Sequence, residues 1–130
     1  MLQTRPANPY LATQVTSSSP LELVVLLYDG AIRAVRSARD AVVQKNIPAR
    51  REALSRALSI IAELQGTLDH EKAADLSREL DRIYAWCASR LLDGAMQHQV
   101  APFEEVDRVL DTLRSAWRTI ASGPAPPGAP

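Results

Sequence analysis

The sequence has little of what catalytic, disulfide-bonded or membrane-spanning chains need. Its 130 residues include one cysteine, Cys87, and two histidines, His70 and His98. A lone cysteine can form neither an internal disulfide nor a cysteine-based zinc site. The longest aliphatic run, Leu23–Leu27, is far shorter than the roughly 20 apolar residues of a bilayer-spanning helix. Because no signal-peptide pattern is found near the amino terminus either, the sequence predicts a cytoplasmic protein without membrane insertion.

Net charge is also absent, because fifteen basic residues balance fifteen acidic ones. A neutral chain has no overall field that attracts nucleic acid or anionic lipid, so no nucleic-acid partner is expected. The charges are placed unevenly, however. Residues 31–60 hold seven basic and two acidic residues, whereas residues 61–111 hold eleven acidic and five basic ones. The simplest interpretation is that neighbouring helices present complementary faces to one another.

Catalytic and metal-binding patterns are equally scarce. The sequence has no glycine-rich phosphate loop and no HExxH or GxSxG pattern. Neither histidine follows a glutamate by three residues, as a di-iron bundle would require. Both histidines fall in predicted connections, whereas a histidine phosphotransfer protein would expose one in the middle of a helix. We therefore predict no enzyme activity, no metal site and no cofactor.

Prolines mark the joints of the chain and indicate four helices. Pro20, Pro48 and Pro102 each fit a first helical turn, and Ser19 with Glu22 forms a capping box ahead of the first helix. The expected helices cover residues 20–44, 48–68, 73–96 and 102–121, and no segment alternates with the period of a strand. Connections of roughly three to six residues favour antiparallel neighbours. The predicted fold class is all-α, an antiparallel up-and-down four-helix bundle.

The bundle domain is expected to cover residues 19–121, with a different kind of segment on either side. Residues 1–18 are predicted to form an extended N-terminal arm, and Tyr10, Leu11 and Val15 are the apolar side chains expected to cover part of a groove. Residues 122–130 form a tail rich in proline, glycine and alanine. Such a tail has almost nothing to bury, and we expect it to be disordered.

Helical periodicity gives the expected core residues of the last two helices. These are Leu76, Leu80, Ile83, Tyr84, Cys87 and Leu91 in the third helix, and Val106, Val109, Leu110, Leu113, Trp117 and Ile120 in the fourth. Trp86 falls instead among charged residues on the polar face of the third helix. It is either a half-buried residue at a helix–helix rim or a contact residue for a partner.

The first helix has more apolar surface than a four-helix bundle can bury. Its apolar arc spans about 220° at 100° per residue, whereas a bundle interior uses roughly 100–140°. Gly30 lies within the helix, where glycine costs about 1 kcal/mol relative to alanine and is normally kept for close backbone approach. Either another helix of the bundle or an outside partner could make that approach. The surplus predicts a further cover, which is a second copy, a partner or the N-terminal arm.

Several motifs resemble those of the FliS-type flagellar export chaperones. They are Asn8-Pro9-Tyr10, Val15, Ser19-Pro20, Leu27-Tyr28-Asp29-Gly30-Ala31, Ile60-Ile61, Glu63-Leu64, Leu68-Asp69, Leu80, Tyr84, Arg90-Leu91, Glu105-Val106, Leu113-Arg114, Ala116-Trp117 and Ile120. The sequence departs from the family pattern at Ala73-Ala74, where paired glycines are common, and at Met96, where asparagine is frequent. Neither departure argues against binding of a client.

The resemblance implies a cytoplasmic chaperone that binds the C-terminal segment of flagellin. It prevents premature polymerisation and keeps flagellin competent for export by the flagellar type III secretion machinery. In this family the client wraps around the bundle, partly as helices in apolar grooves, and the chaperone's own arm can occupy part of the groove. The resemblance carries this covering role to Tyr10, while Leu11 and Val15 are added on their chemistry alone. The expected groove residues are Leu23, Leu27, Tyr28, Gly30, Ala31, Ile61, Leu64 and Trp86.

Two alternatives belong to other classes of protein. The surplus face of the first helix could form a homodimer that has no client, so a monomer and a weak homodimer both remain open. A histidine phosphotransfer protein would need His70 or His98 as its phosphate acceptor, and their place in connections counts against it.

Overall fold

The computed structural model describes residues 19–123, and this part of the chain forms four α-helices and no strand. The helices are α2 (Pro20–Val43), α3 (Ile47–Gly66), α4 (Ala74–Gln97) and α5 (Ala101–Ala121). These bounds agree with the predicted ones to within two residues at every end. The expectations for Tyr10, Leu11 and Val15, and for the tail from residue 124 on, fall outside the described residues.

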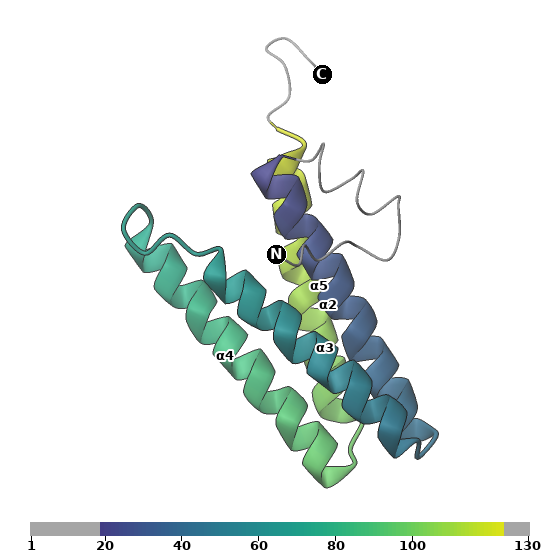
Figure 1. Cartoon of the computed structure of the whole chain (residues 1–130). Coiled ribbons are helices and arrows are strands. Elements are labelled where there is room, and N and C mark those ends of the chain that lie inside the picture. The colour runs from purple at the N-terminus through teal and green to yellow at the C-terminus, as the bar shows by residue number, and fades with distance from the viewer. Residues whose placement is uncertain (1–18, 124–130) are drawn as a thin grey trace, which may run out of the picture.

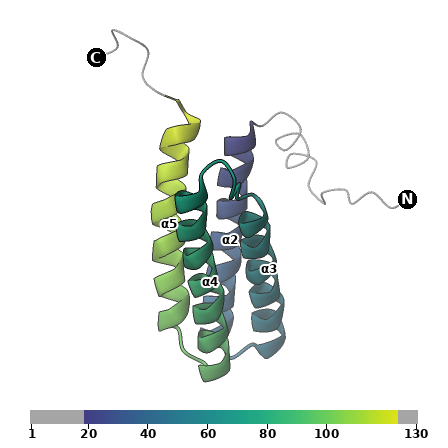
Figure 2. The same ribbon diagram turned by 90° about the vertical axis from the view of Figure 1, so that its left-hand side faces the viewer.

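Successive helices run antiparallel and pack side by side, and α5 packs against α2 to close the ring (Figures 1 and 2). As a result α2 lies between α3 and α5, and α4 lies between the same two helices on the other side. The α2–α3 and α4–α5 connections share one end of the bundle. At the other end, the tips of α2 and α5 reach beyond the α3–α4 connection (Figure 2). The all-α bundle is confirmed.

Local sequence explains where the helices begin. The Ser19 hydroxyl accepts a hydrogen bond from the Glu22 N–H at 3.2 Å, and the Asn46 side chain accepts one from the Ala49 N–H at 3.1 Å. Each bond satisfies a donor that the first helical turn leaves without a backbone partner. Proline stands in the first turn of α2, α3 and α5, where a missing N–H costs little.

Two helices end on a residue in the left-handed conformation. The φ angle is 57° at Lys45, after α2, and 54° at His98, after α4. In both places the next N–H donates to a carbonyl five residues earlier, at 2.9 Å after Lys45 and at 3.0 Å after His98. This is the Schellman arrangement, which satisfies the last carbonyls of a helix and turns the chain sharply.

The core lies between the four helices and combines large side chains with alanines. The largest fully buried ones are Tyr28, Tyr84, Phe103, Ile32, Ile61, Leu64, Leu91 and Leu110. Cys87 is buried among them, as predicted. Burial raises the pKa of its thiol to about 12, so the thiol stays protonated and unreactive at neutral pH.

The tightest contact at a glycine involves Gly94, which the sequence analysis did not single out. A Cβ added there would lie 2.8 Å from Cε2 of Phe103 in α5. At Gly30 an added Cβ would lie 3.3 Å from Cδ1 of Ile60 in α3. Another helix of the bundle therefore does approach Gly30, but less closely and through the flexible end of a side chain.

Two residues expected in the core are exposed. Leu76 is 56% exposed and Ile120 is 54% exposed. Leu76 lies in the first turn of α4, and Ile120 lies in the tip of α5 that passes the α3–α4 connection (Figure 2). The prediction was wrong here because periodicity identifies the side of a helix that faces the core. It does not tell whether a neighbouring helix reaches the same height.

Ion pairs connect α2 with α5, and the pair of Arg36 with Asp107 follows the uneven distribution of charge. Arg36 Nε lies 2.9 Å from Asp107 Oδ2, and Arg114 Nη1 lies 2.9 Å from Asp29 Oδ1. An exposed pair such as Arg36–Asp107 is worth about 0–1 kcal/mol, whereas both side chains of the Arg114–Asp29 pair are partly buried. At least one arginine of the basic stretch is therefore paired with an acid of the acidic stretch on a neighbouring helix.

Candidate partner-binding surface

The surface of the described residues is hollowed between α2 and α3, and we call this recess the α2/α3 groove. It has a volume of about 560 Å³. Its lining combines an apolar floor with charged side chains: Leu23, Leu26, Leu27, Gly30, Arg33, Arg56, Ile60, Glu63 and Thr67. Because Gly30 has no side chain, the floor stays open beside Ile60. Arg33 and Arg56 are exposed and form no ion pair with any other residue in 19–123.

A second recess, the α2/α4 cavity, adjoins this groove and has a volume of about 450 Å³. Leu23, Leu27 and Thr67 line both, so the two recesses form one continuous surface around the first half of α2. The cavity is also lined by residues of the α3–α4 connection, α4 and α5. They include Leu68, Asp69, Leu76, Ser77, Leu80, Tyr84 and Trp117.

A buried pair of tyrosine hydroxyls lies beside the α2/α4 cavity. The hydroxyl oxygens of Tyr28 and Tyr84 are 2.5 Å apart, and Trp117 Nε1 donates to the Tyr28 oxygen at 3.2 Å. The ring centroids of the two tyrosines are 6.3 Å apart. Burial raises the pKa of both hydroxyls, so both keep their protons at neutral pH.

A third recess, the α4/α5 groove, lies between the other two helices of the ring and therefore opposite the α2/α3 groove. It has a volume of about 610 Å³ and is lined by Arg82, Ile83, Trp86, Arg108, Val109, Thr112 and Leu113. Trp86 is 41% exposed, so a large apolar surface is open to solvent in this groove. Like the α2/α3 groove, this groove has two arginines beside an apolar floor.

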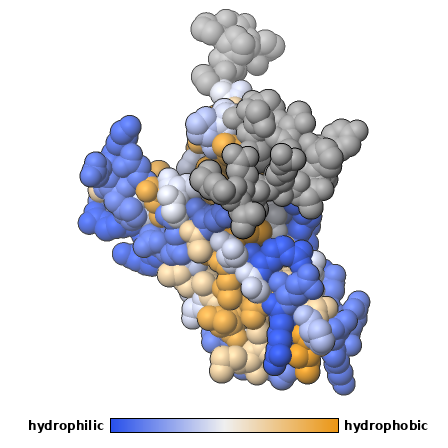
Figure 3. All heavy atoms as spheres, in the orientation of Figure 1, coloured by the Kyte–Doolittle hydropathy of each residue, from blue (hydrophilic) through white to orange (hydrophobic). Residues whose placement is uncertain are grey.

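Apolar side chains are also exposed at the end of the bundle that carries the α2–α3 connection. Figure 3 shows them gathered on the lower half of the face, between hydrophilic margins. Val43, Ile47, Leu92 and Met96 are the large exposed residues near this end.

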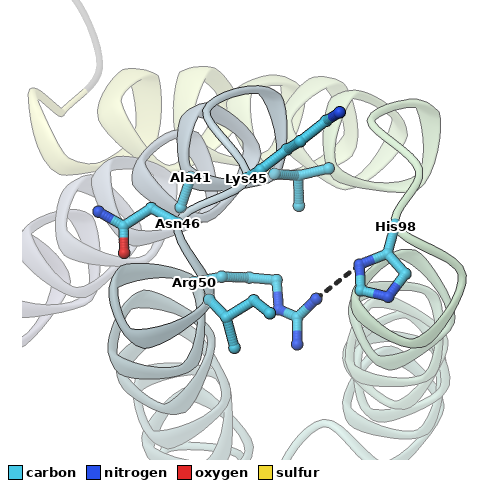
Figure 4. A pocket seen from close by; sticks show the side chains of 7 residues that line it. Ala41, Lys45, Asn46, Arg50 and His98 are labelled. Atoms are coloured by element: carbon cyan, nitrogen blue, oxygen red, sulfur yellow. Dashed lines mark hydrogen bonds between the residues drawn. The ribbon is translucent and has the colours of Figure 1, made fainter.

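A small pocket of about 300 Å³ at the same end contains Arg50 and His98 (Figure 4). Arg50 Nη1 lies 2.9 Å from His98 Nδ1. A guanidinium only donates, so Nδ1 of His98 is the acceptor in this contact. The side chains of Lys45 and Asn46 point away from Arg50 (Figure 4). The cations therefore do not converge, and the pocket does not have the form of an anion site.

The structure divides the predicted groove residues into three groups. Leu23, Leu27 and Gly30 line the α2/α3 groove, and Trp86 lines the α4/α5 groove. The remaining four, Tyr28, Ala31, Ile61 and Leu64, are fully buried in the core beneath α2 and α3. Periodicity gave the extent of the apolar arc of α2 but not which part of it faces inward.

Sequence reasoning missed several residues that line the α2/α3 groove. Leu26 was not predicted at all, and Ile60 was named only among the motifs of the resemblance. The arginines at positions 33 and 56 were counted as part of a basic stretch without a specific place. The spacing of the two arginines in the sequence does not predict that they share a groove. They come together only because α2 packs against α3.

The described part of the chain has neither a membrane-spanning helix nor a metal-binding cluster. No helix within residues 19–123 is both long and apolar enough to cross a membrane. The same residues contain no cluster of three or more histidine, cysteine or acidic side chains placed to hold a metal ion.

Comparison with known proteins gives the family. The family model described as flagellar protein FliS matches residues 3–124. The flagellar secretion chaperone FliS of Salmonella typhimurium strain LT2 is 35% identical over 116 residues, covering 88% of this chain and 86% of that protein. FliS of Bacillus subtilis strain 168 is 30% identical over 114 residues, with 85% and 84% covered. FliSB of Pseudomonas aeruginosa strain PAO1 is 29% identical over 111 residues, with 85% and 88% covered.

These matches extend over nearly all of the bundle and agree with its all-α architecture. They also agree with the expected absence of enzyme activity, since proteins of this family are chaperones. The chain belongs to the FliS family of flagellar secretion chaperones.

Proposed function

We propose that this chaperone binds the C-terminal segment of flagellin in the bacterial cytoplasm, prevents its premature polymerisation and keeps it competent for export. Family membership supports the class of function, and the partners are then flagellin and the flagellar export machinery. The observation that carries the choice of surface is the α2/α3 groove. The floor of this groove is apolar and open to solvent. It lies along α2, the helix that also contributes most of the alanines in the core.

The groove suits an amphipathic helix of the client. Leu23, Leu27 and Ile60 would receive the apolar side chains of such a helix. Arg33 and Arg56 would pair with its carboxylates, since both cations lack a partner among the described residues. The core residues Tyr28, Ala31, Ile61 and Leu64 would act from below, by holding α2 and α3 in position.

The α4/α5 groove is the proposed second docking place, with Trp86 as its central contact. Tryptophan is enriched among residues that dominate binding energy. Because the two grooves lie on opposite sides of the ring, one client segment would have to wrap around the bundle to fill both. Ordering such a segment costs about 2–5 kcal/mol or more, which several separate apolar contacts can offset.

The arm stays part of the proposal. Tyr10, Leu11 and Val15 would cover part of the α2/α3 groove when no client is bound. The arm joins α2 at Pro20 and Leu21, which line the α2/α4 cavity, so the chain enters the bundle next to these recesses.

A matched pair of glycine variants tests the groove. Gly30→Leu places a side chain in the α2/α3 groove, whereas the Cβ of Gly66→Leu meets nothing within 4 Å. Both changes replace a helical glycine, so both raise helix propensity. We expect Gly30→Leu to weaken binding of the flagellin C-terminal segment at least tenfold in calorimetry, and Gly66→Leu to change it less than twofold.

Equal affinities for the two variants would contradict the groove assignment. A wild-type chain that binds no flagellin segment and stays dimeric on dilution in analytical ultracentrifugation would support the homodimer alternative instead.

A further inference from the structure

The α2/α3 groove has a direction, because its charged residues are distributed unevenly along it. On α2 the lining runs from Leu23 at one end to Arg33 at the other. On the antiparallel α3 it runs the opposite way, so Thr67 lies at the same end as Leu23 and Arg56 at the same end as Arg33. Both arginines therefore stand at the end of the groove nearer the α2–α3 connection.

The contact between Gly30 and Ile60 gives the alignment of the two helices. A Cβ at Gly30 would lie 3.3 Å from Cδ1 of Ile60, so these residues face each other within the lining. Arg33 follows Gly30, and Arg56 precedes Ile60, by about one helical turn in each case. Arg33 Nη2 lies 3.9 Å from the same Cβ position, so its guanidinium leans back over the floor of the groove. An occupant of the groove can therefore reach this charge.

The acidic residue of the lining lies toward the other end. Glu63 follows Ile60 by about one turn, away from the arginines, and no other acidic residue among those described lines the groove. Like Arg33 and Arg56, Glu63 is exposed and forms no ion pair within residues 19–123. The groove is thus positive toward the α2–α3 connection and negative toward the α3–α4 connection.

The apolar floor between these ends has the length of a short helix. From Leu23 to Arg33, α2 advances about 15 Å, which a bound helix of about ten residues would match. Such a helix has a partial positive charge at its N-terminus and a partial negative charge at its C-terminus, where the last four carbonyls lack partners within the helix. The two directions in which it could lie in the groove therefore differ in energy.

We infer that the flagellin helix bound in the α2/α3 groove runs parallel to α2, with its C-terminal turn beside Arg33 and Arg56 and its N-terminal turn toward Glu63. The inference rests on the proposed function and adds the direction of the client and the chemistry of its end. Guanidinium groups donate to the free carbonyls of a C-terminal turn, and a carboxylate near an N-terminus interacts favourably with the helix dipole. The opposite direction would bring like charges together at both ends. The groove therefore favours a client helix whose own carboxylates lie in its last turn.

Spin labels at the two ends of α3 test the direction. Ser55→Cys places a nitroxide next in sequence to Arg56, and Gly66→Cys places one next to Thr67, where an added Cβ meets nothing within 4 Å. Ser55 is exposed, whereas Cys87 is buried and keeps its thiol protonated, so only the added cysteines react at neutral pH. Each labelled full chain is mixed with the ¹⁵N-labelled C-terminal segment of flagellin, and paramagnetic broadening is measured residue by residue.

The groove-bound stretch of the segment should have helical chemical shifts. The label at position 66 should broaden residues nearer the N-terminal end of this helix, and the label at position 55 residues nearer its C-terminal end. The reverse order, equal broadening by both labels, or a bound stretch without helical shifts would overturn the inference. Calorimetry provides the control, since both labelled chains should bind the segment within twofold of the wild-type affinity.

A second measurement needs no label. A peptide that ends where the bound helix ends should bind about threefold more tightly with a free C-terminal carboxylate than with a C-terminal amide, because the carboxylate adds a negative charge beside the arginines. Arg33→Gln with Arg56→Gln should remove this difference. Equal affinities of the two peptides for the wild-type chain, or tighter binding of the amide, would contradict the direction.

The remaining outcomes are distinct. If the wild-type chain binds no flagellin segment, the proposed function fails and the inference fails with it. If the segment binds as a helix in the groove but with the reverse order of broadening, the proposed function stands and only the direction is refuted.

Discussion

At the scale of single residues, Gly94 permits the contact between α4 and α5. We expect Gly94→Ala to lower the free energy of unfolding by about 1–3 kcal/mol, because its Cβ would lie 2.8 Å from the buried Phe103 ring. Chemical denaturation measures the change. Gly66→Ala is the control, since its Cβ meets nothing within 4 Å, and it should stabilise the chain by about 0.5–1 kcal/mol. A Gly94→Ala chain as stable as the wild type would show that the two helices can separate without cost.

Cys87 gives a prediction for alkaline pH. Burial raises the pKa of its thiol from 9.0 to about 12, so between these values the unfolded chain loses a proton that the folded chain keeps. The free energy of unfolding should therefore fall as pH rises above 9, by about 1.4 kcal/mol per pH unit from this group. Denaturation at pH 8 and pH 10 should show a smaller loss in Cys87→Ala than in the wild type. Equal losses would mean that the thiol is not protected by the core.

Single residues also mark the limit of what the sequence could predict. Cys87 and Leu110 were placed correctly because periodicity put them at the centre of an apolar stripe. Tyr28 and Ile61 were expected in a groove and lie in the core, because the wide arc of α2 and its neighbour gives no inward direction until the helices are packed. The hydroxyl pair of Tyr28 and Tyr84 could not be foreseen, since it joins residues 56 positions apart.

At the scale of the elements, all four helices could be predicted because their signals are local. A hydrogen-bonding cap stands ahead of α2 and of α3, and proline occupies the first turn of α2, α3 and α5. The exposed positions of Leu76 and Ile120 could not be predicted. They depend on how far one helix extends past the next, which is set by the tertiary packing and not by local sequence.

The paired arginines of the α2/α3 groove give a prediction for α2 and α3 together. Arg33→Gln with Arg56→Gln should slow association with the flagellin segment several-fold at low salt and weaken its salt dependence, because exposed charges act mainly on the association rate. Stopped-flow fluorescence measures both effects. Lys45→Gln with Arg51→Gln removes the same charge from exposed positions outside the groove and should have a smaller effect. Identical rates for the two double variants would contradict pairing of the client with Arg33 and Arg56.

At the scale of the whole molecule, the proposal depends on apolar recesses that the bundle leaves open on opposite sides. Burial of the client's apolar surface in them should dominate binding, and burial of this kind lowers the heat capacity. The central claim is therefore tested most directly by calorimetric titration of the full chain, at several temperatures, with a C-terminal segment of flagellin from the same organism. We predict saturable 1:1 binding with a negative heat-capacity change. No heat at any temperature, together with no complex in gel filtration, would contradict the claim that this chain is a chaperone for flagellin.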